Sequence, residues 1–194
     1  MSKKVIALLA EGFEEVEAFT PIDYLRRARV DVTVAAVNKS LTVRGSHGIQ
    51  VIADASLDDL AGDGRLRPSS WDGVVVPGGL PGAVNLAASK QVGDFLKGMS
   101  EAGKMIAAIC ASPARVLSPL GLLAGKKFTC YPGEEKNISP SHLAGTERKE
   151  DRVVIDGNLV TSRGAGTAGE FAVAIIGELT SAEEAKKLAD KVLL

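Results

Sequence analysis

The sequence is poor in aromatic residues and in cysteine, and it carries almost no net charge. Only 4% of the 194 residues are aromatic although 45% are hydrophobic, so the core must be built from Val, Ile, Leu and Ala. Continuous aliphatic runs are what a buried parallel sheet requires. The length suits one substantial core, and neither an internal repeat nor a linker divides the chain. We therefore expect a single domain over residues 1–194.

The near balance of charge excludes several classes of partner. With 23 basic and 24 acidic residues, the chain shows no basic footprint for nucleic acid or for an anionic membrane. No apolar run reaches the roughly 20 residues that span a bilayer, and the apolar stretch at residues 5–10 is too short for a signal peptide. The expected location is cytoplasmic, and the expected partner is a small molecule or a second copy of the chain.

Cys110 and Cys130 are the two cysteines of the chain. The reducing conditions of the cytoplasm disfavour a structural disulfide, and neither cysteine has metal-ligand spacing to the other or to a histidine. His47 and His142 stand in loop-like segments without an acid or a cysteine at motif spacing, so both are expected to be solvated. Cys130 is expected to be a semi-buried structural thiol. The sequence predicts neither a metal nor a cofactor.

Strand and helix patterns alternate along most of the chain. Apolar runs predict strands at 5–10, 30–37, 73–76 and 105–109, a short strand at 128–131, and hairpins within 41–52 and 153–161. Periodicity and two capping boxes, at Thr167 and Ser181, predict helices at 13–25, 56–60, 83–102, 111–117, 167–179 and from 181 onward. Pro21 is expected to kink or restart the first helix. The alternation predicts an α/β fold with a mainly parallel sheet.

Cys110 directly follows the predicted strand at 105–109 and precedes a predicted helix. The helix dipole and free backbone N–H groups at such a position favour the thiolate. The small neighbours Ala111 and Ser112 suit a nucleophile elbow, and the loops after strands 5–10 and 73–76 are expected to meet it at one sheet edge. The alternative is a buried cysteine that serves as a small apolar side chain. The strand-end position favours a reactive nucleophile.

Two further groups are candidates for the same site. Gly78 and Gly79 can bring backbone N–H groups close to a substrate oxygen and form an oxyanion hole with the N–H of Ala111, although Pro-Gly-Gly is also ordinary turn chemistry. Glu17 belongs to an acidic cluster whose other members, at positions 11, 14 and 15, are expected to be solvated at a helix start. A Glu17 carboxyl turned towards Cys110 is compatible with a thiolate only when it is protonated, and it can then shuttle protons.

Residues 164–169 match the dinucleotide fingerprint G-x-G-x-x-G between a predicted strand and a predicted helix. No strand that ends in a ribose-binding acid follows about 20 residues later, so nucleotide binding is not expected. The N–H groups at this helix start can instead hold an anion or line the pocket.

Four segments, in order along the chain, resemble the ThiJ/PfpI family, close to its Parkinson disease protein 7 branch. They are residues 10–17 (AEGFEEVE), 76–79 (VPGG), 107–113 (AAICASP) and 161–167 (TSRGAGT). The resemblance implies a flavodoxin-like three-layer sandwich with helices on both faces of the sheet, a homodimer and no cofactor. It also implies a site in which Cys110 is the nucleophile, Glu17 is its protonated partner, Gly79 and Ala111 are the oxyanion donors, and the pocket is lined by Tyr131, Arg163 and Gly164.

The chain departs from the family pattern near the site. Tyr131 stands where many relatives have a histidine, and a phenol, with an ordinary pKa of about 10, is a poor base at neutral pH. Ala111 stands where protease and amidase branches of the superfamily have a histidine after the cysteine, which disfavours a Cys-His-acid hydrolase. Ala165 replaces a proline of close relatives, a change that bears on the rigidity of its loop.

The resemblance implies a cofactor-independent, cysteine-dependent glyoxalase or deglycase. Its substrates would be small carbonyl compounds, namely α-oxoaldehydes such as methylglyoxal and glyoxal, or their early glycation adducts, in oxidative or carbonyl stress. The alternative is a redox-sensing chaperone whose Cys110 is oxidised to a sulfinate, without a dedicated enzymatic activity. Peptidase or amidase activity and a role in thiazole biosynthesis are less favoured. The two leading hypotheses need the same acidified thiol, so the sequence does not separate them.

Overall fold

The structure is a computed structural model that describes residues 2–194. Its strands are β1 (Lys4–Leu9), β2 (Asp31–Ala36), β3 (Thr42–Arg44), β4 (Gln50–Ile52), β5 (Ala55–Ser56), β6 (Gly73–Val76), β7 (Met105–Ile109), β8 (Lys127–Phe128), β9 (Glu147–Arg148), β10 (Val153–Asp156) and β11 (Leu159–Ser162). Its α-helices are α1 (Glu15–Arg27), α2 (Leu57–Gly62), α3 (Gly82–Ala88), α4 (Lys90–Glu101), α5 (Ala168–Leu179) and α6 (Ala182–Val192).

A seven-stranded sheet runs through the centre of the molecule in the order β10-β11-β7-β6-β1-β2-β5. Its pairings are parallel except that of β10 with β11, which form the predicted antiparallel hairpin. The chain leaves β1 for β2 on one side and later returns to pair β6 on the other side of β1. The strand order therefore reverses between β1 and β6, and ligands of open α/β sheets bind at the carboxyl ends of such a pair.

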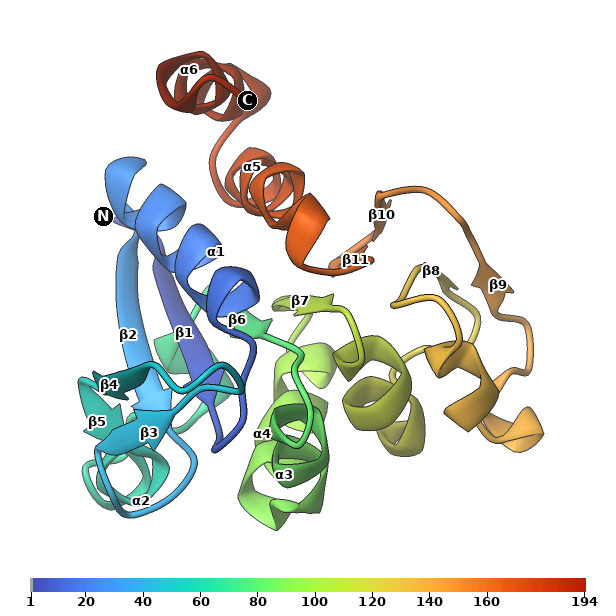
Figure 1. The fold of residues 1–194 in the computed structure, drawn as a ribbon, viewed down its shortest axis with the longest axis horizontal. Helices are drawn as coiled ribbons and strands as arrows, with labels where there is room; N and C mark the ends of the chain where they lie inside the picture. The colour runs from blue at the N-terminus through green and yellow to red at the C-terminus, as the bar shows by residue number, and fades with distance from the viewer. Residues whose placement is uncertain (1) are drawn as a thin grey trace.

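Helices cover both faces of this sheet (Figure 1). In Figure 1, α1 and α5 lie on one side of the sheet and α3 and α4 on the other. The alternation of side chains along β1 supplies both interfaces, because Ile6 and Leu8 belong to one buried cluster and Val5, Ala7 and Leu9 to the other. Strands that are buried on both faces are continuous apolar runs in the sequence, and the sequence analysis predicted the strands from such runs. The α/β, flavodoxin-like sandwich is confirmed.

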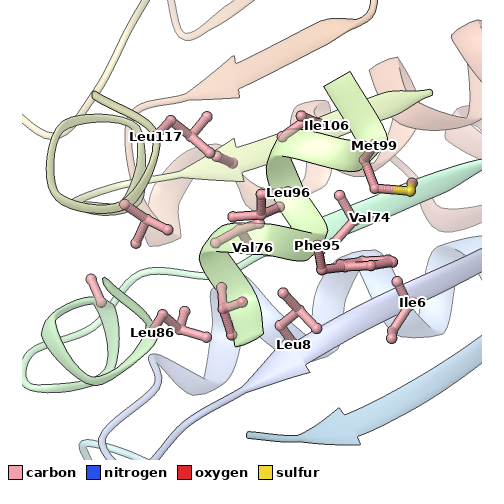
Figure 2. Close-up of a cluster of buried hydrophobic side chains, with 14 of the residues drawn as sticks. Ile6, Leu8, Val74, Val76, Leu86, Phe95, Leu96, Met99, Ile106 and Leu117 are labelled. Carbon is pink, nitrogen blue, oxygen red and sulfur yellow. The ribbon is translucent and has the colours of Figure 1, made fainter. Parts of the chain in front are cut away.

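The core on the α3 and α4 side is almost entirely aliphatic (Figure 2). Sheet residues from three neighbouring strands face side chains from α3, α4 and the turn after Cys110, and these include Ile6, Leu8, Val74, Val76, Ile106, Leu86, Phe95, Leu96, Met99 and Leu117. Each fully buried side chain of this kind contributes about 1.5–3 kcal/mol of transfer free energy. This packing fixes the backbone from which the loops at the carboxyl edge project.

One helix prediction is wrong in detail, and one of the two effects expected of Pro21 is absent. The predicted helix at 83–102 is two helices, α3 and α4, because Ser89 takes an extended conformation (φ −81°, ψ 111°) and its Oγ accepts a hydrogen bond from the N–H of Val92 at 3.3 Å. A serine that caps the next helix ends the preceding one. Pro21 does not restart α1, which runs without interruption through that residue.

The two predicted capping boxes have different outcomes. Ser181 caps α6 by accepting from the N–H of Glu184 at 3.2 Å, which is the serine half of the predicted box. The Thr167 box is not formed, because Thr167 Oγ1 accepts from the N–H of Gly164 at 3.1 Å and lies 2.6 Å from Ser162 Oγ. The carboxylate of Glu170 instead pairs with Arg152 (Oε1 to Nε, 2.8 Å).

Candidate active site

Three loops meet at the carboxyl ends of β1, β6 and β7, as the sequence predicted. The loop after β1 is tied to the loop after β6 by a hydrogen bond from the N–H of Glu14 to the carbonyl of Gly78 (3.0 Å). The loop after β7 is tied to it by Ser112, whose Oγ donates to the carbonyl of Pro77 at 2.5 Å. Both bonds end on a main-chain carbonyl of the loop after β6, so the three loops form one unit.

Cys110 occupies a strained backbone position at the end of β7. Its φ angle is +65°, in the left-handed region that side chains other than glycine rarely adopt. Two hydrogen bonds hold it there: its N–H donates to the carbonyl of Ser162 (2.9 Å), and its carbonyl accepts from the N–H of Tyr131 (2.8 Å). Such a conformation costs about 1–3 kcal/mol and persists at sites where the surrounding structure enforces it. The predicted sharp strand-end turn is present.

The element after this turn differs from the expected helix. Residues Pro113–Leu117 form a five-residue π-helical turn, not a regular α-helix. Single π-helical turns are rare and concentrate at functional sites. A turn of this length supplies less dipole than the helix on which the prediction of an acidified thiol depended.

The carboxyl of Glu17 reaches the sulfur from α1. Glu17 is 1% exposed, and its Oε2 accepts from the N–H of Gly78 at 3.0 Å. The carboxyl also interacts with the thiol of Cys110 and with the N–H of Ala165. A Cβ atom at Gly78 would lie 2.6 Å from Glu17 Oε2, 2.6 Å from Cys110 Cβ and 3.1 Å from Cys110 Sγ. Glycine is therefore required between the two side chains, since no real Cβ fits there.

Burial governs the ionisation of this pair. It raises the pKa of Glu17 to about 7, against the opposing hydrogen bonds from Cys110, Gly78 and Ala165. Burial also raises the pKa of the Cys110 thiol, and the charge of an ionised Glu17 raises it further. The thiol is therefore not acidified, chiefly because of burial, in contrast to the expectation from the helix start. Two groups this close titrate as a pair that shares its protons.

The predicted oxyanion donors divide into two groups. The backbone N–H groups of Gly79 and Ala111 both interact with the Cys110 sulfur and favour its charged form. Gly79 has a φ angle of +91°, which a glycine adopts without strain. The N–H of Gly78 donates to Glu17 and so does not face the sulfur. Gly78 thus holds the carboxyl, and Gly79 and Ala111 surround the thiol.

A cavity of about 450 Å³ opens over Cys110. It is lined by residues of the three loops, of the turn between β3 and β4 and of the segment after Cys130, namely Glu14, Ser46, His47, Gly79, Leu80, Cys110, Ala111, Tyr131 and Glu134. Of the predicted pocket residues, Tyr131 lines the cavity and is 53% exposed. Arg163 and Gly164, the other two, are not among the described residues that line it.

Arg163 and Gly164 have other positions near the site. The Arg163 guanidinium donates to the carbonyl of Glu150 at 3.0 Å. A Cβ at Gly164 would lie 3.3 Å from Tyr131 Cδ2 and 3.7 Å from Glu17 Oε1, so Gly164 lies behind the buried carboxyl. The helix-start N–H groups of the 164–169 motif were expected to hold an anion or line the pocket. One of them, the N–H of Ala165, interacts with the carboxyl of Glu17.

Sequence reasoning missed the pair formed by Glu15 and His47. Glu15 was expected to be solvated, but it is 4% exposed. Its Oε1 accepts from the N–H of His47 at 2.7 Å, and its Oε2 lies 2.7 Å from His47 Nδ1. The imidazole is 70% exposed, as predicted, yet it lines the cavity over Cys110 and has an acid partner. No local signal reveals this pair, because the two residues are 32 positions apart.

Glu14, Glu15 and His47 also offer ligand atoms that lie within 4.8 Å of one another. The carboxylate of Glu15 already accepts from the N–H groups of His47 and Ile49 and from the hydroxyl of Ser46. Glu14 Oε2 caps α1 by accepting from the N–H of Glu17 at 2.7 Å. These hydrogen bonds account for the cluster without a cation.

The fold and the site together define a class of protein. It is a flavodoxin-like α/β protein with a cysteine in a strained strand-end turn, beside a buried carboxyl and two backbone N–H groups. A model of the DJ-1/PfpI family matches residues 3–178. The chain belongs to the DJ-1/PfpI family.

Individual relatives agree with this membership. The chain is 40% identical to protein dj-1beta of Drosophila melanogaster over 195 residues, covering 100% of this chain and 98% of that protein. It is 32% identical to the glutathione-independent glyoxalase DJR-1.2 of Caenorhabditis elegans over 184 residues, covering 95% of this chain and 92% of that protein. The solved structure of oxidized Toxoplasma gondii DJ-1 superposes with a TM-score of 0.89 at 38% identity, covering 99% and 98% of the two chains.

Some relatives are much longer than this chain. It is 41% identical to protein DJ-1 homolog B of Arabidopsis thaliana over 192 residues, which is 98% of this chain but 41% of that protein. The chain thus spans less than half the length of this plant relative. Within residues 2–194, no helix has the length and apolarity needed to cross a membrane.

Proposed function

We propose that this protein is a cofactor-independent glyoxalase or deglycase that acts on α-oxoaldehydes such as methylglyoxal and glyoxal, or on their early glycation adducts. The observation that carries the proposal is the buried carboxyl of Glu17, with a pKa raised to about 7, in contact with the Cys110 thiol under an open cavity. A group with a pKa near the working pH is well suited to accept and return a proton. The glyoxalase name of the worm relative supports the same chemistry.

The first step is addition of the sulfur to the aldehyde carbon. Glu17 as a carboxylate takes the thiol proton while the Cys110 sulfur forms its bond to that carbon. The raised pKa of the thiol is then no obstacle, because a free thiolate need not accumulate. The N–H groups of Gly79 and Ala111 stabilise the oxyanion that forms on the same carbon. Glu17 then returns its proton to this oxygen, which gives a neutral hemithioacetal.

The second step moves a hydrogen between the two carbons of the substrate. Glu17, again a carboxylate, removes the proton from the carbon bonded to sulfur and gives an enediolate. It then delivers that proton to the neighbouring carbon. The hydroxyl proton of the sulfur-bound carbon passes to the enediolate oxygen, so the sulfur-bound carbon becomes a thioester carbonyl and its neighbour an alcohol. Water hydrolyses the thioester, releasing a 2-hydroxy acid and the free thiol. Oxidation of one substrate carbon is balanced by reduction of the other, so the sequence needs no external oxidant.

The test is the formation of lactate from methylglyoxal without glutathione. We expect wild-type protein to produce lactate and Cys110→Ser to lose at least ~10³-fold in rate, as is usual when a covalent nucleophile is removed. Cys130→Ser is the matched control, because Cys130 is fully buried in the core and should leave the rate unchanged. Wild-type protein that makes no more lactate than Cys110→Ser would refute the proposal.

A redox-sensing chaperone is the second candidate function. The name of the Toxoplasma gondii structure states that the protein is oxidized, and Cys110 is the more exposed of the two cysteines here. A thiolate flanked by N–H donors is open to oxidation to a sulfinate, which a protonated Glu17 would hydrogen-bond. After mild peroxide, mass spectrometry should find two added oxygen atoms on Cys110 and little change on Cys130. Equal oxidation of both cysteines would count against this role.

We also propose that the chain forms a homodimer in the cytoplasm, as its family resemblance implies. The start of α1 and the β3–β4 hairpin leave Val16, Ile49 and Ile52 exposed by 48%, 53% and 79%. Exposed apolar side chains of this kind suit a contact between two copies. Light scattering should give twice the chain mass for wild-type protein and a lower mass for Ile52→Glu. A monomeric wild-type protein would contradict the proposal.

A further inference from the structure

The wall of the cavity that carries Tyr131 lacks the imidazole that many relatives have at this position. Another wall of the same cavity carries His47, in the turn between β3 and β4. Among the described residues that line this cavity there is no lysine or arginine. His47 is therefore the group of the lining that can present a positive charge and a mobile proton to a bound substrate.

The turn that carries His47 is fixed to the start of α1. The N–H of Ser46 donates to the carbonyl of Phe13 at 2.8 Å, and the N–H of His47 donates to Glu15 Oε1 at 2.7 Å. Glu15 Oε2 then holds the imidazole Nδ1 at 2.7 Å. With Nδ1 engaged by the carboxylate, Nε2 is the ring nitrogen left for a ligand. A histidine oriented by a buried carboxylate in this way is preorganised for acid–base work.

The charges around this histidine support its protonated form. The hydrogen bond to Glu15 raises the pKa of His47, and the charge of Glu15 adds to the effect. Burial alone would raise the pKa of Glu15, but the hydrogen bonds from the His47 side chain and backbone outweigh it and keep Glu15 ionised. The other ionisable groups near the imidazole are Glu14, whose Oε1 lies 3.9 Å from Nδ1, and those that line the same cavity, namely Cys110, Tyr131 and Glu134.

Glu134 is paired with an arginine. Its two carboxylate oxygens accept from Arg115 Nε at 2.6 Å and from a terminal guanidinium nitrogen of Arg115 at 3.1 Å. A bidentate ion pair of this geometry neutralises the carboxylate and fixes its orientation. The imidazolium of His47 is then the positive charge that a substrate in the cavity meets, with the carboxyl of Glu14 beside it.

We propose that His47, oriented by Glu15, is a second acid–base residue of this site and moves a proton between the two substrate oxygens, beginning with the oxygen on the carbon next to the one attacked by Cys110. The proposal rests on the proposed glyoxalase chemistry. As Glu17 removes the proton from the sulfur-bound carbon, His47 Nε2–H donates its proton to the neighbouring carbonyl oxygen, which gives a neutral enediol. As Glu17 returns its proton to the neighbouring carbon, His47 takes back a proton from the oxygen on the sulfur-bound carbon. Both residues end each cycle as they began.

His47 acts on the substrate and not on the sulfur. The groups that shift the pKa of the Cys110 thiol are burial, Glu17 and the N–H groups of Gly79 and Ala111, and His47 is not among those described. A Cys-His pair of the hydrolase kind would require a direct hydrogen bond between the two side chains. The cavity of about 450 Å³ that both residues line has room for a small dicarbonyl compound. This favours proton transfer at the second oxygen over activation of the thiol.

The first experiment measures lactate formation from methylglyoxal by His47→Asn across pH 5 to 9. Asparagine keeps a side-chain N–H near the Nδ1 position, so that Glu15 remains hydrogen-bonded, and removes Nε2. We expect kcat to fall by roughly 10²-fold, with less change in KM, and the alkaline limb of the wild-type pH profile to disappear. His142→Asn is the matched control and should match wild type, since His142 lies outside the cavity lining.

A second experiment tests the placement of the imidazolium without turnover. Alkylation of Cys110 by the anion iodoacetate is compared with alkylation by neutral iodoacetamide. In wild-type protein the preference for the anion should fall as His47 loses its proton, and in His47→Asn it should not vary with pH. His47→Arg should keep the preference at every pH but should not restore turnover, because arginine does not release its proton.

The outcomes separate the two proposals. If wild-type protein makes no more lactate than Cys110→Ser, the glyoxalase function fails and the proton step at the second oxygen fails with it. If wild-type protein is active while His47→Asn stays within about twofold of it, the role of His47 alone is overturned. A wild-type alkylation preference that does not change with pH overturns the placement of the imidazolium over Cys110.

Discussion

The two ends of the central sheet carry cavities of opposite character. At the amino ends of the strands a cavity of about 620 Å³ is lined by charged and polar side chains, among them Lys3, Lys4, Arg65, Arg67, Asp72 and Lys104. At the carboxyl ends the cavity over Cys110 is smaller, about 450 Å³. The larger cavity contains side chains that pair with one another, whereas the smaller one adjoins a strained cysteine and a buried carboxyl of raised pKa. The candidate site is therefore marked by perturbed groups that are kept at a cost in stability, and not by the size of its cavity.

The largest expected effect concerns activity at the two ends. Glu17→Gln keeps the shape of the side chain but removes the group that moves protons, so the rate of lactate formation should fall by about 10²–10⁴-fold. Lys104→Gln, at the amino-end cavity, should leave the rate unchanged. Steady-state kinetics with methylglyoxal measure both. Equal losses of rate in the two variants would show that the carboxyl end of the sheet is not specifically required for activity.

The next effect is a dependence of stability on pH. Burial raises the pKa of Glu17 from 4.5 to about 7, so between these values the folded protein holds a proton that the unfolded chain has released. The free energy of unfolding should therefore fall as pH rises through this window, by about 3 kcal/mol in total, since one pKa unit is worth ~1.4 kcal/mol.

Urea unfolding at about pH 5 and about pH 8 measures this contribution. Two proteins are compared, the single variant Cys110→Ser and the double variant that also carries Glu17→Gln. Both lack the Cys110 thiol, so no proton is shared between the thiol and the carboxyl. The double variant, which lacks the Glu17 carboxyl, should lose less stability between the two pH values. Parallel pH dependence in the two proteins would show that the Glu17 carboxyl is ionised throughout.

A smaller effect is expected from Gly78, the glycine between the side chains of Glu17 and Cys110. Gly78→Ala places a Cβ 2.6 Å from Cys110 Cβ and from Glu17 Oε2, and overpacking of this kind costs about 1–3 kcal/mol. Gly62→Ala is the matched control, because nothing lies within 4 Å of a Cβ at the exposed end of α2. Thermal unfolding of both variants measures the difference. A Gly78→Ala protein as stable and as active as Gly62→Ala would contradict the close packing of the site.

The smallest effect is expected at the amino end. Asp72 accepts from the N–H of Lys4 at 2.9 Å and pairs with Lys3 and Lys104 at 4.0 and 3.8 Å. Exposed pairs of this kind contribute about 0–1 kcal/mol and are screened by salt. Asp72→Asn should lower the unfolding free energy by no more than that, with the loss reduced in high salt and lactate formation unaffected. A loss of activity here would indicate a functional role for the larger cavity.

Glu15 and Glu17 differ in whether their positions at the candidate site could be predicted from the sequence. Glu17 was predicted because its partner, Cys110, stands in a recognisable place at the end of an apolar run. Glu15 was not, because its partner His47 lies in a short hairpin whose position over α1 depends on long-range packing. A lone histidine between two glycines, Gly45 and Gly48, was the available signal, and it is too common in loops to carry a role.

The ionisation of the Cys110 thiol is a second property that could not be predicted from the sequence. A cysteine between a strand and a helix favours the thiolate when it is partly exposed to solvent at the N-terminus of the helix, near the positive end of the helix dipole. Here the helix start is a short π-helical turn, and burial together with Glu17 raises the pKa of Cys110. Depth of burial is a property of the packed layers, and no local pattern encodes it.

The sequence by itself determined the α/β class and the order of strands and helices along most of the chain, and it singled out Cys110 as the centre of the candidate site. These follow from the period of apolar residues and from the position of a reactive residue at a strand end, both of which are local. Only the tertiary structure decided the reversal of strand order between β1 and β6, the enclosure of Glu17 and the approach of His47 to the cavity. Each of these depends on contacts between residues tens of positions apart, which form only when the layers pack.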